Sequence, residues 1–246
     1  MKEERSQSMF VNNHKTYNKV FCIGFNKTGT TSLEYTLGEF GFSCGSQWKG
    51  ELLIKDWNLR GMEGVESLCN TAEVFQDVPF SLPKLYESLD QMFPQSKFIL
   101  TIRDSEHQWY SSLTNFHAKV FASNKKKPPT PNDLMNATYV YRGWALDFFK
   151  IAFDYPAIPL YDEEKYKSIY LDHINDVRLH FKGRKKDLLL LNLADPNGFS
   201  ELVEFLEIKD PSINSFPKKN KTEKGIVGAL KKLARIVLVR KFNKAN

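Results

Sequence analysis

The chain has 246 residues, of which 41% are hydrophobic and 26% are charged. This composition excludes collagen-like, low-complexity and globally disordered classes, and the length predicts one large or two small domains. The net charge is +6 at pH 7, but acidic residues outnumber basic ones over residues 1–217, and the excess of lysine and arginine lies in residues 218–246. Because the body has no basic stripe, we expect no nucleic-acid partner.

Cysteine usage and the first residues bear on the compartment. The three cysteines, Cys22, Cys44 and Cys69, are odd in number and lack metal-ligand spacing, which is typical of a reducing compartment. The opening residues are polar and lack the apolar core of a signal peptide, and no apolar run is long enough to cross a bilayer. We therefore expect a cytoplasmic protein.

Short apolar runs alternate with stretches of helical spacing along the chain. The runs predict buried parallel strands, and the stretches between and after them predict helices. In chain order we expect a strand at 19–24, helices at 31–40 and 64–70, a strand at 73–77, a helix at 82–93, a strand at 97–102, helices at 105–122, 133–153 and 166–181, a strand at 187–193 and a helix at 199–206. This order predicts an α/β fold of three layers, with a central parallel sheet flanked by helices.

A glycine-containing loop follows the first predicted strand and leads into the first helix. It reads Gly24-Phe25-Asn26-Lys27-Thr28-Gly29-Thr30-Thr31-Ser32. A strand, a tight loop and a helix N-terminus form an anion cradle, to which Lys27 adds a cation and the threonines add hydroxyl donors. A nucleotide triphosphatase P-loop places its lysine directly after the second glycine, whereas Lys27 precedes Gly29 by two residues.

The displaced lysine resembles the 5′-phosphosulfate loop of the sulfotransferases that use 3′-phosphoadenosine 5′-phosphosulfate (PAPS). The resemblance implies a P-loop-type fold and a sulfotransferase domain over residues 19–222, preceded by an extension (1–18) and followed by a basic tail (223–246). It also implies that Lys27 is catalytic and stabilises the bridging oxygen, with no metal. The implied contacts to the 5′ end of the nucleotide are Asn26, Lys27, Thr28, Gly29, Thr30, Thr31 and Ser32.

Two further segments extend this resemblance. Arg103 ends the third predicted strand and Ser111 lies eight residues later, which is the family's 3′-phosphate spacing; the alternative for Arg103 is an ion pair with Asp104 or Glu106. The segment Phe216-Pro217-Lys218-Lys219-Asn220 resembles the late loop that closes over the nucleotide. It makes Lys218, Lys219 and Asn220 candidate contacts, with a solvated basic run as the alternative.

The candidate base is Asp77, at the end of the second predicted strand and flanked by apolar residues. Such a setting raises the pKa of a carboxyl group toward a range useful for proton transfer. The alternative role is a turn or helix-capping aspartate before Pro79, and the rival bases are His107, His117 and His173. Candidate acceptor contacts are Phe80, Tyr141 and Trp144, with core packing as their alternative.

The resemblance implies transfer of a sulfuryl group from PAPS to a hydroxyl or amine of a small-molecule or carbohydrate acceptor, leaving 3′-phosphoadenosine 5′-phosphate (PAP). The alternatives are a P-loop kinase or nucleotide triphosphatase that uses ATP and Mg²⁺, and a non-catalytic nucleotide-binding protein of the same fold. Within the tail, Ile226, Leu230, Leu233 and Val237 share one helical face opposite several basic residues. This pattern favours a helix docked on the body, with peripheral membrane contact as the alternative.

Overall fold

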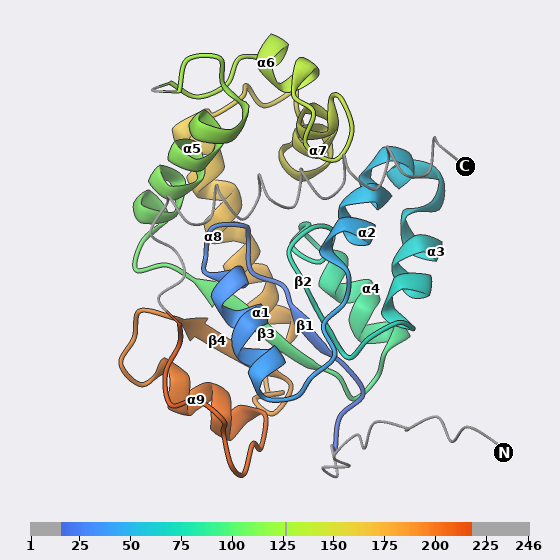
Figure 1. Cartoon of the computed structure of the whole chain (residues 1–246), viewed down its shortest axis with the longest axis vertical. Helices are drawn as coiled ribbons and strands as arrows, with labels where there is room; N and C mark the ends of the chain where they lie inside the picture. The colour runs from blue at the N-terminus through green and yellow to red at the C-terminus, as the bar shows by residue number, and fades with distance from the viewer. Residues whose placement is uncertain (1–15, 126, 218–246) are drawn as a thin grey trace, which may run out of the picture.

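A parallel sheet forms the centre of the molecule. The structure, a computed structural model, describes residues 16–125 and 127–217. Within them, β1 (Val20–Cys22), β2 (Val74–Gln76), β3 (Lys97–Ile102) and β4 (Leu188–Asn192) form one sheet in the order β2-β1-β3-β4. Every neighbouring pair is parallel, as Figure 1 shows. The predicted α/β class with a parallel sheet is confirmed.

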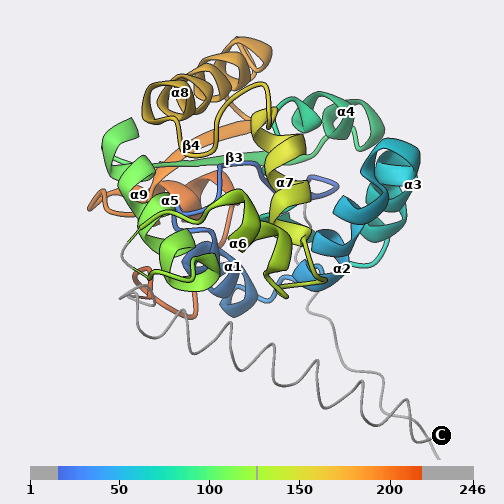
Figure 2. The ribbon, with the colours of Figure 1, turned by 90° about the horizontal axis from the view of Figure 1, so that it is seen from above.

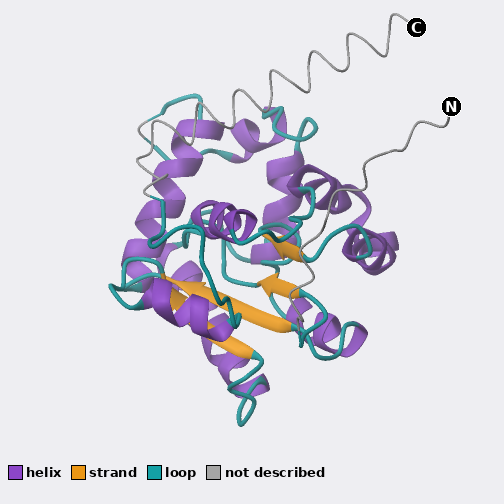
Figure 3. Ribbon diagram, turned by 60° about the horizontal axis from the view of Figure 1, so that its bottom comes forward, coloured by secondary structure: helices purple, strands orange, loops and turns teal. Residues whose placement is uncertain are grey.

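Helices cover both faces of this sheet. Seen from above in Figure 2, α4 and α8 lie on one side of the strands and α1 and α9 on the other. The helices are α1 (Thr30–Glu39), α2 (Gln47–Leu52), α3 (Trp57–Cys69), α4 (Leu85–Met92), α5 (Glu106–Phe121), α6 (Pro131–Asn136), α7 (Trp144–Phe153), α8 (Glu163–His180) and α9 (Gly198–Phe205), with a 3₁₀ turn, η1 (Leu53–Asp56), between α2 and α3. The sheet therefore lies between two helical layers, as predicted (Figure 3).

Alternation along the strands divides the core into two clusters. Phe21 and Phe98 pack with the aromatic and aliphatic side chains of α4 and α8. Their strand neighbours Val20, Cys22 and Ile99 pack instead with the leucines of α1 and α9. Because successive strand residues point to opposite faces, continuous apolar runs are what a sheet covered on both sides requires.

The predicted helix at 133–153 is wrong, because two shorter helices replace it. α6 ends at Asn136 and α7 begins at Trp144. Between them Thr138 bridges Arg142 in antiparallel fashion, and Gly143 adopts a left-handed conformation with φ of 88°. The intervening Thr-Tyr-Val-Tyr run has weak helix propensity, and the glycine caps α7. Tyr141 therefore lies before the helix and not in its apolar stripe.

The segment between the first helix and the second strand contains more helix than the sequence predicts. α3 begins at Trp57, well before the predicted start at residue 64, and it is preceded by α2 and η1. The sequence predicts no helix over 41–63, because α2 is too short to display a helical period. The Ser46 side chain caps α2 by accepting a hydrogen bond from the Lys49 N–H at 3.4 Å.

Close approach of β1 and β3 determines where the chain leaves the sheet. A Cβ atom at Gly24 would lie 2.1 Å from Thr101 Oγ1 and 2.4 Å from the Thr101 carbonyl oxygen. Only glycine allows the backbones to approach this closely. The loop that follows β1 therefore starts directly beside the carboxyl end of β3.

We predict that Gly24→Ala destabilises the protein by about 1–3 kcal/mol, because the new methyl group must displace the backbone of β3. The matched control is Gly38→Ala in α1, where an added Cβ meets no atom within 4 Å. That control should be neutral or stabilising by about 0.5–1 kcal/mol, since alanine favours the helix. Urea unfolding of the two variants measures the difference, and equal stability of both would contradict the close approach.

Candidate functional site

The loop between β1 and α1 (residues 23–29, here the β1–α1 loop) leads directly into a helix N-terminus. Gly29 is the N-cap of α1 with φ of 106°, and no side chain caps the helix there. The first turn of α1 contains no acidic residue. Backbone N–H groups at the start of a helix and the positive end of its dipole favour a bound anion, so this geometry fits a phosphate or sulfate group.

Two side chains from the β3–α5 segment hold the β1–α1 loop. Trp109 donates its indole N–H to the Asn26 carbonyl oxygen at 3.0 Å, and Arg103 donates Nε–H to the Lys27 carbonyl oxygen at 2.7 Å. Trp109 is fully buried and stacks on Tyr170 of α8 with ring centroids 4.5 Å apart. The Tyr170 hydroxyl in turn accepts a hydrogen bond from the Arg103 N–H at 2.9 Å. Trp109 is not among the predicted site residues, although it lies between Arg103 and Ser111 in the sequence.

The side chains of the loop threonines divide between interior and surface. The Thr28 hydroxyl donates to the Phe25 carbonyl oxygen at 2.6 Å and also contacts the Thr101 hydroxyl, so this buried side chain ties the loop to β3. Thr30 and Ser32 are buried at the start of α1, whereas Thr31 is exposed. Any anion contact from Thr28 therefore has to come from its backbone N–H.

Lys27 lies in a left-handed backbone conformation and its side chain is partly buried. Its φ is 74°, and its Nζ lies 3.7 Å from the centroid of the Phe116 ring, a cation–π contact from α5. Burial lowers the pKa of Lys27 to about 8; Asp77 opposes the shift, and Arg103 adds to it. Phe116, which is not among the predicted site residues, thus accounts for the position of the ammonium group.

Asp77 lies directly after β2 and is joined to the β1–α1 loop by hydrogen bonds. Its Oδ1 accepts from the Asn26 side-chain amide and from the Val78 N–H at 2.9 Å, and its Oδ2 accepts from Gln47 Nε2 at 3.3 Å. Asn26 also accepts from the Ser81 hydroxyl at 3.1 Å. Val78 is buried, as the apolar flanks predict, but polar groups hold the carboxylate itself. The structure therefore brings Asp77 and Lys27, two predicted site residues, to one place.

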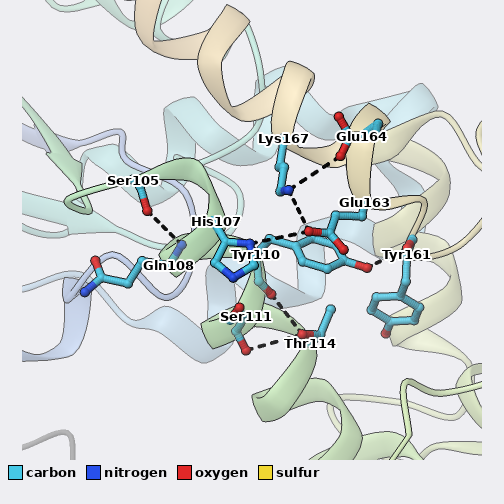
Figure 4. Close-up of polar contacts among 10 residues, drawn as sticks. All are labelled: Ser105, His107, Gln108, Tyr110, Ser111, Thr114, Tyr161, Glu163, Glu164 and Lys167. Atoms are coloured by element: carbon cyan, nitrogen blue, oxygen red, sulfur yellow. Dashed lines mark hydrogen bonds and ion pairs between the residues drawn. The ribbon is translucent and has the colours of Figure 1, made fainter.

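The rival histidines occupy different environments. His107 is exposed and lies 3.5 Å from Glu163 (Figure 4). His173 is buried and its Nε2 contacts the Ile23 carbonyl oxygen at 2.9 Å, which supports the strand before the loop. His117 is buried against Tyr161, and burial together with the charge of Lys27 lowers its pKa to about 3. A histidine of such low pKa is a weak proton acceptor.

Arg103 and Ser111 lie on adjoining parts of the β3–α5 segment. Asp104 accepts hydrogen bonds from the Gln108 and Asn192 side chains, while Arg103 turns to the Lys27 carbonyl oxygen. Among the described residues, the two terminal nitrogens of Arg103 make no hydrogen bond. The alternative of an Arg103–Asp104 ion pair therefore does not describe this arrangement.

The helix that carries Ser111 is anchored to the start of α8. The Tyr110 hydroxyl of α5 donates to the Tyr161 carbonyl oxygen at 2.6 Å. Glu163 of α8 forms an ion pair with Lys167 at 2.6 Å and lies 3.5 Å from His107 of α5. Figure 4 shows these contacts around Ser111. They hold the first turns of α5 against the start of α8.

The predicted acceptor contacts lie largely in the core. Phe80 is 2% exposed and packs against Phe21 and Phe75. Trp144 is 4% exposed and donates its indole N–H to the Glu51 carbonyl oxygen at 2.7 Å. The Tyr141 hydroxyl donates to Asp147 at 3.1 Å. Their contact with an acceptor stays a prediction.

Several predicted features lie outside the described residues. They are Lys218, Lys219 and Asn220, and the amphipathic tail over 223–246. Over 16–125 and 127–217, no helix combines the length and apolar character needed to cross a bilayer. The same residues contain no cluster of three or more histidine, cysteine, aspartate or glutamate side chains suited to a metal ion.

The parallel sheet, the β1–α1 loop and the uncapped start of α1 define an α/β protein whose fold is consistent with the P-loop type. A family model described as a sulfotransferase domain matches residues 19–225, so the chain belongs to the sulfotransferase family. No curated protein matches the chain significantly.

We predict that Lys27→Met stabilises the fold at pH 7 by about 1–2 kcal/mol, because it removes a desolvated ammonium group. The pKa of Lys27 is lowered from 10.5 to about 8, so between these values the unfolded chain holds a proton that the folded protein lacks. Wild-type stability therefore rises with pH over this range and the advantage of the variant shrinks. Urea unfolding of both proteins at about pH 7 and about pH 10 measures this, and an advantage that grows with pH would contradict it.

Proposed function

We propose that this sulfotransferase moves a sulfuryl group from PAPS to a hydroxyl or amine of a small-molecule or carbohydrate acceptor. The observation that carries the proposal is the convergence of Lys27, Arg103 and the uncapped start of α1 on one loop, in a chain of the sulfotransferase family. Each of these groups favours an anion, and their number suits a ligand with more than one negative group.

The residues present fit such a donor. Backbone N–H groups from Thr28 to Ser32 would bind its 5′ end, because Gly29 leaves the start of α1 without a side-chain cap. Arg103 keeps its terminal nitrogens for the 3′-phosphate while Nε holds the loop, and Ser111 on α5 adds a hydroxyl. Lys218, Lys219 and Asn220 would complete the contacts from the late loop.

Two residues of the chain have roles in the transfer. PAPS supplies the activated sulfuryl group. Lys27 places an ammonium group beside the loop, where it would offset negative charge on the bridging oxygen of a bound donor. Asp77 presents a carboxylate held by the Asn26 amide and accepts the proton of the acceptor hydroxyl or amine at one of its oxygens. The two groups are close enough for Asp77 to raise the pKa of Lys27 against the effect of burial.

Ligand-induced thermal stabilisation distinguishes this function from the alternatives. We expect PAP, without added metal, to raise the melting temperature, because binding to the folded state alone stabilises it. ATP with Mg²⁺ should produce no comparable shift. A response to ATP and Mg²⁺ alone would instead indicate the kinase or nucleotide triphosphatase alternative. A protein that binds PAP but sulfates nothing across a broad acceptor panel would indicate the non-catalytic alternative.

We predict that Asp77→Asn lowers kcat by about 10²–10⁴-fold, because the asparagine side chain cannot take up the proton that the substrate hydroxyl or amine releases. PAP affinity should stay within about threefold of wild type, since the loop keeps its bonds to Trp109 and Arg103. The matched control is Asp210→Asn, an exposed aspartate beyond α9, which should leave both quantities unchanged. Transfer assays with labelled PAPS and calorimetry with PAP measure the two effects. Full activity of Asp77→Asn would reject this residue as the base.

A further inference from the structure

Gln47, the first residue of α2, connects the carboxylate of Asp77 to a second carboxylate. Its Nε2 donates to Asp77 Oδ2 at 3.3 Å and to Glu51 Oε1 at 2.9 Å. Glu51 lies one helical turn further along α2, and it is only 6% exposed. The site therefore contains a carboxylate–amide–carboxylate arrangement.

Groups from the α6–α7 segment hold Glu51 in place. The Tyr139 hydroxyl donates to Glu51 Oε1 at 3.2 Å, and the Trp144 indole N–H donates to the Glu51 carbonyl oxygen at 2.7 Å. Burial raises the pKa of Tyr139 well above its ordinary value, with Glu51 and Asp77 as further causes. The phenol therefore stays a neutral hydrogen-bond donor, and Glu51 is fixed through both its side chain and its backbone.

The second carboxylate determines which way the Gln47 amide points. An amide that turned its oxygen toward two carboxylates would place three acceptors together, which is unfavourable. With Glu51 present, the NH₂ group must face inward, and one of its hydrogens then lies toward Asp77 Oδ2. Glu51 thus orients a donor that in turn orients the Asp77 carboxylate.

The charge of Glu51 also acts on Asp77. Two oxygens that share one nitrogen donor lie within about 6 Å of each other, a distance at which like charges disfavour each other's ionised form. Within residues 16–125 and 127–217, charged or titratable groups that also act on Asp77 include Lys27 of the β1–α1 loop, with Arg103 beyond it, and Tyr139. Lys27 favours the carboxylate form of Asp77 and Glu51 disfavours it. The proton affinity of Asp77 therefore depends on both Lys27 and Glu51.

We propose that Glu51, acting through Gln47, is a positioning residue that aligns Asp77 and increases its strength as a base. The proposal rests on the proposed role of Asp77 in sulfuryl transfer. No atom of Glu51 needs to touch the donor or the acceptor.

The test uses Glu51→Gln, which keeps an oxygen for Tyr139 and Gln47 and removes the charge. We expect kcat to fall by about tenfold, because a weaker base transfers the proton less readily. The acid limb of the kcat/KM profile should move to lower pH by about one unit. KM for PAPS and affinity for PAP should stay within about twofold of wild type, because the loop contacts are untouched. The control is Glu66→Gln on the exposed side of α3, which should change none of these quantities.

A second readout does not depend on turnover. The ¹³C signal of the Asp77 carboxyl group, assigned by its loss in Asp77→Asn, can be titrated in the protein without nucleotide. Its midpoint should fall by about one pH unit in Glu51→Gln and stay unchanged in Glu66→Gln. Gln47→Leu removes the connecting amide at similar volume, and in that background Glu51→Gln should change kcat less than it does in wild type.

An unchanged Asp77 midpoint in Glu51→Gln would overturn the proposal. Equal effects of Glu51→Gln on kcat with and without Gln47 would overturn the connecting role of the amide. A loss of PAP affinity as large as the loss of kcat would show a structural role and also overturn it. If wild-type protein neither binds PAP nor transfers sulfate, the proposed function fails instead, while the titration still decides whether Glu51 controls the proton affinity of Asp77.

Discussion

Two hydrogen bonds from the β3–α5 segment to carbonyl oxygens of the β1–α1 loop determine where the charges of the site lie. Trp109 holds Asn26 and Arg103 holds Lys27, while the side chains of those two loop residues remain directed to Asp77 and Phe116. Without these bonds a loop with left-handed residues at Lys27 and Gly29 would have many conformations of similar energy. The buried stack of Trp109 on Tyr170 makes the arrangement part of the core.

The sequence predicts the central sheet well because its signals are local. The third strand, at 97–102, is found where it is predicted, since a covered parallel strand is a continuous apolar run. The prediction of one helix at 133–153 is wrong. The aromatic spacing is typical of a single helix, but Gly143 and the preceding segment with β-branched residues interrupt it. Here local backbone preference outweighs the periodicity of apolar residues.

The candidate site is predictable to the extent that its residues adjoin strand ends. Lys27, Asp77 and Arg103 each follow a strand of one parallel sheet, so topology alone brings them to the same edge. Gln47 and Glu51 lie on a helix too short to show a period, and the contact of Gln47 with both Glu51 and Asp77 depends on the tertiary packing of α2. Phe116 and Trp109 look like ordinary apolar residues of α5, and only the folded chain shows which groups they contact.

Together these features describe a member of the sulfotransferase family in which the β1–α1 loop is held by the core, with the side chains of Lys27 and Asp77, of opposite charge, beside it. We propose that the nucleotide binds at the β1–α1 loop, and amide hydrogen exchange with and without PAP tests this most directly. We predict that PAP slows exchange at the amides of residues 28–32 and at the start of α5. Slowed exchange elsewhere with none at these amides would contradict it.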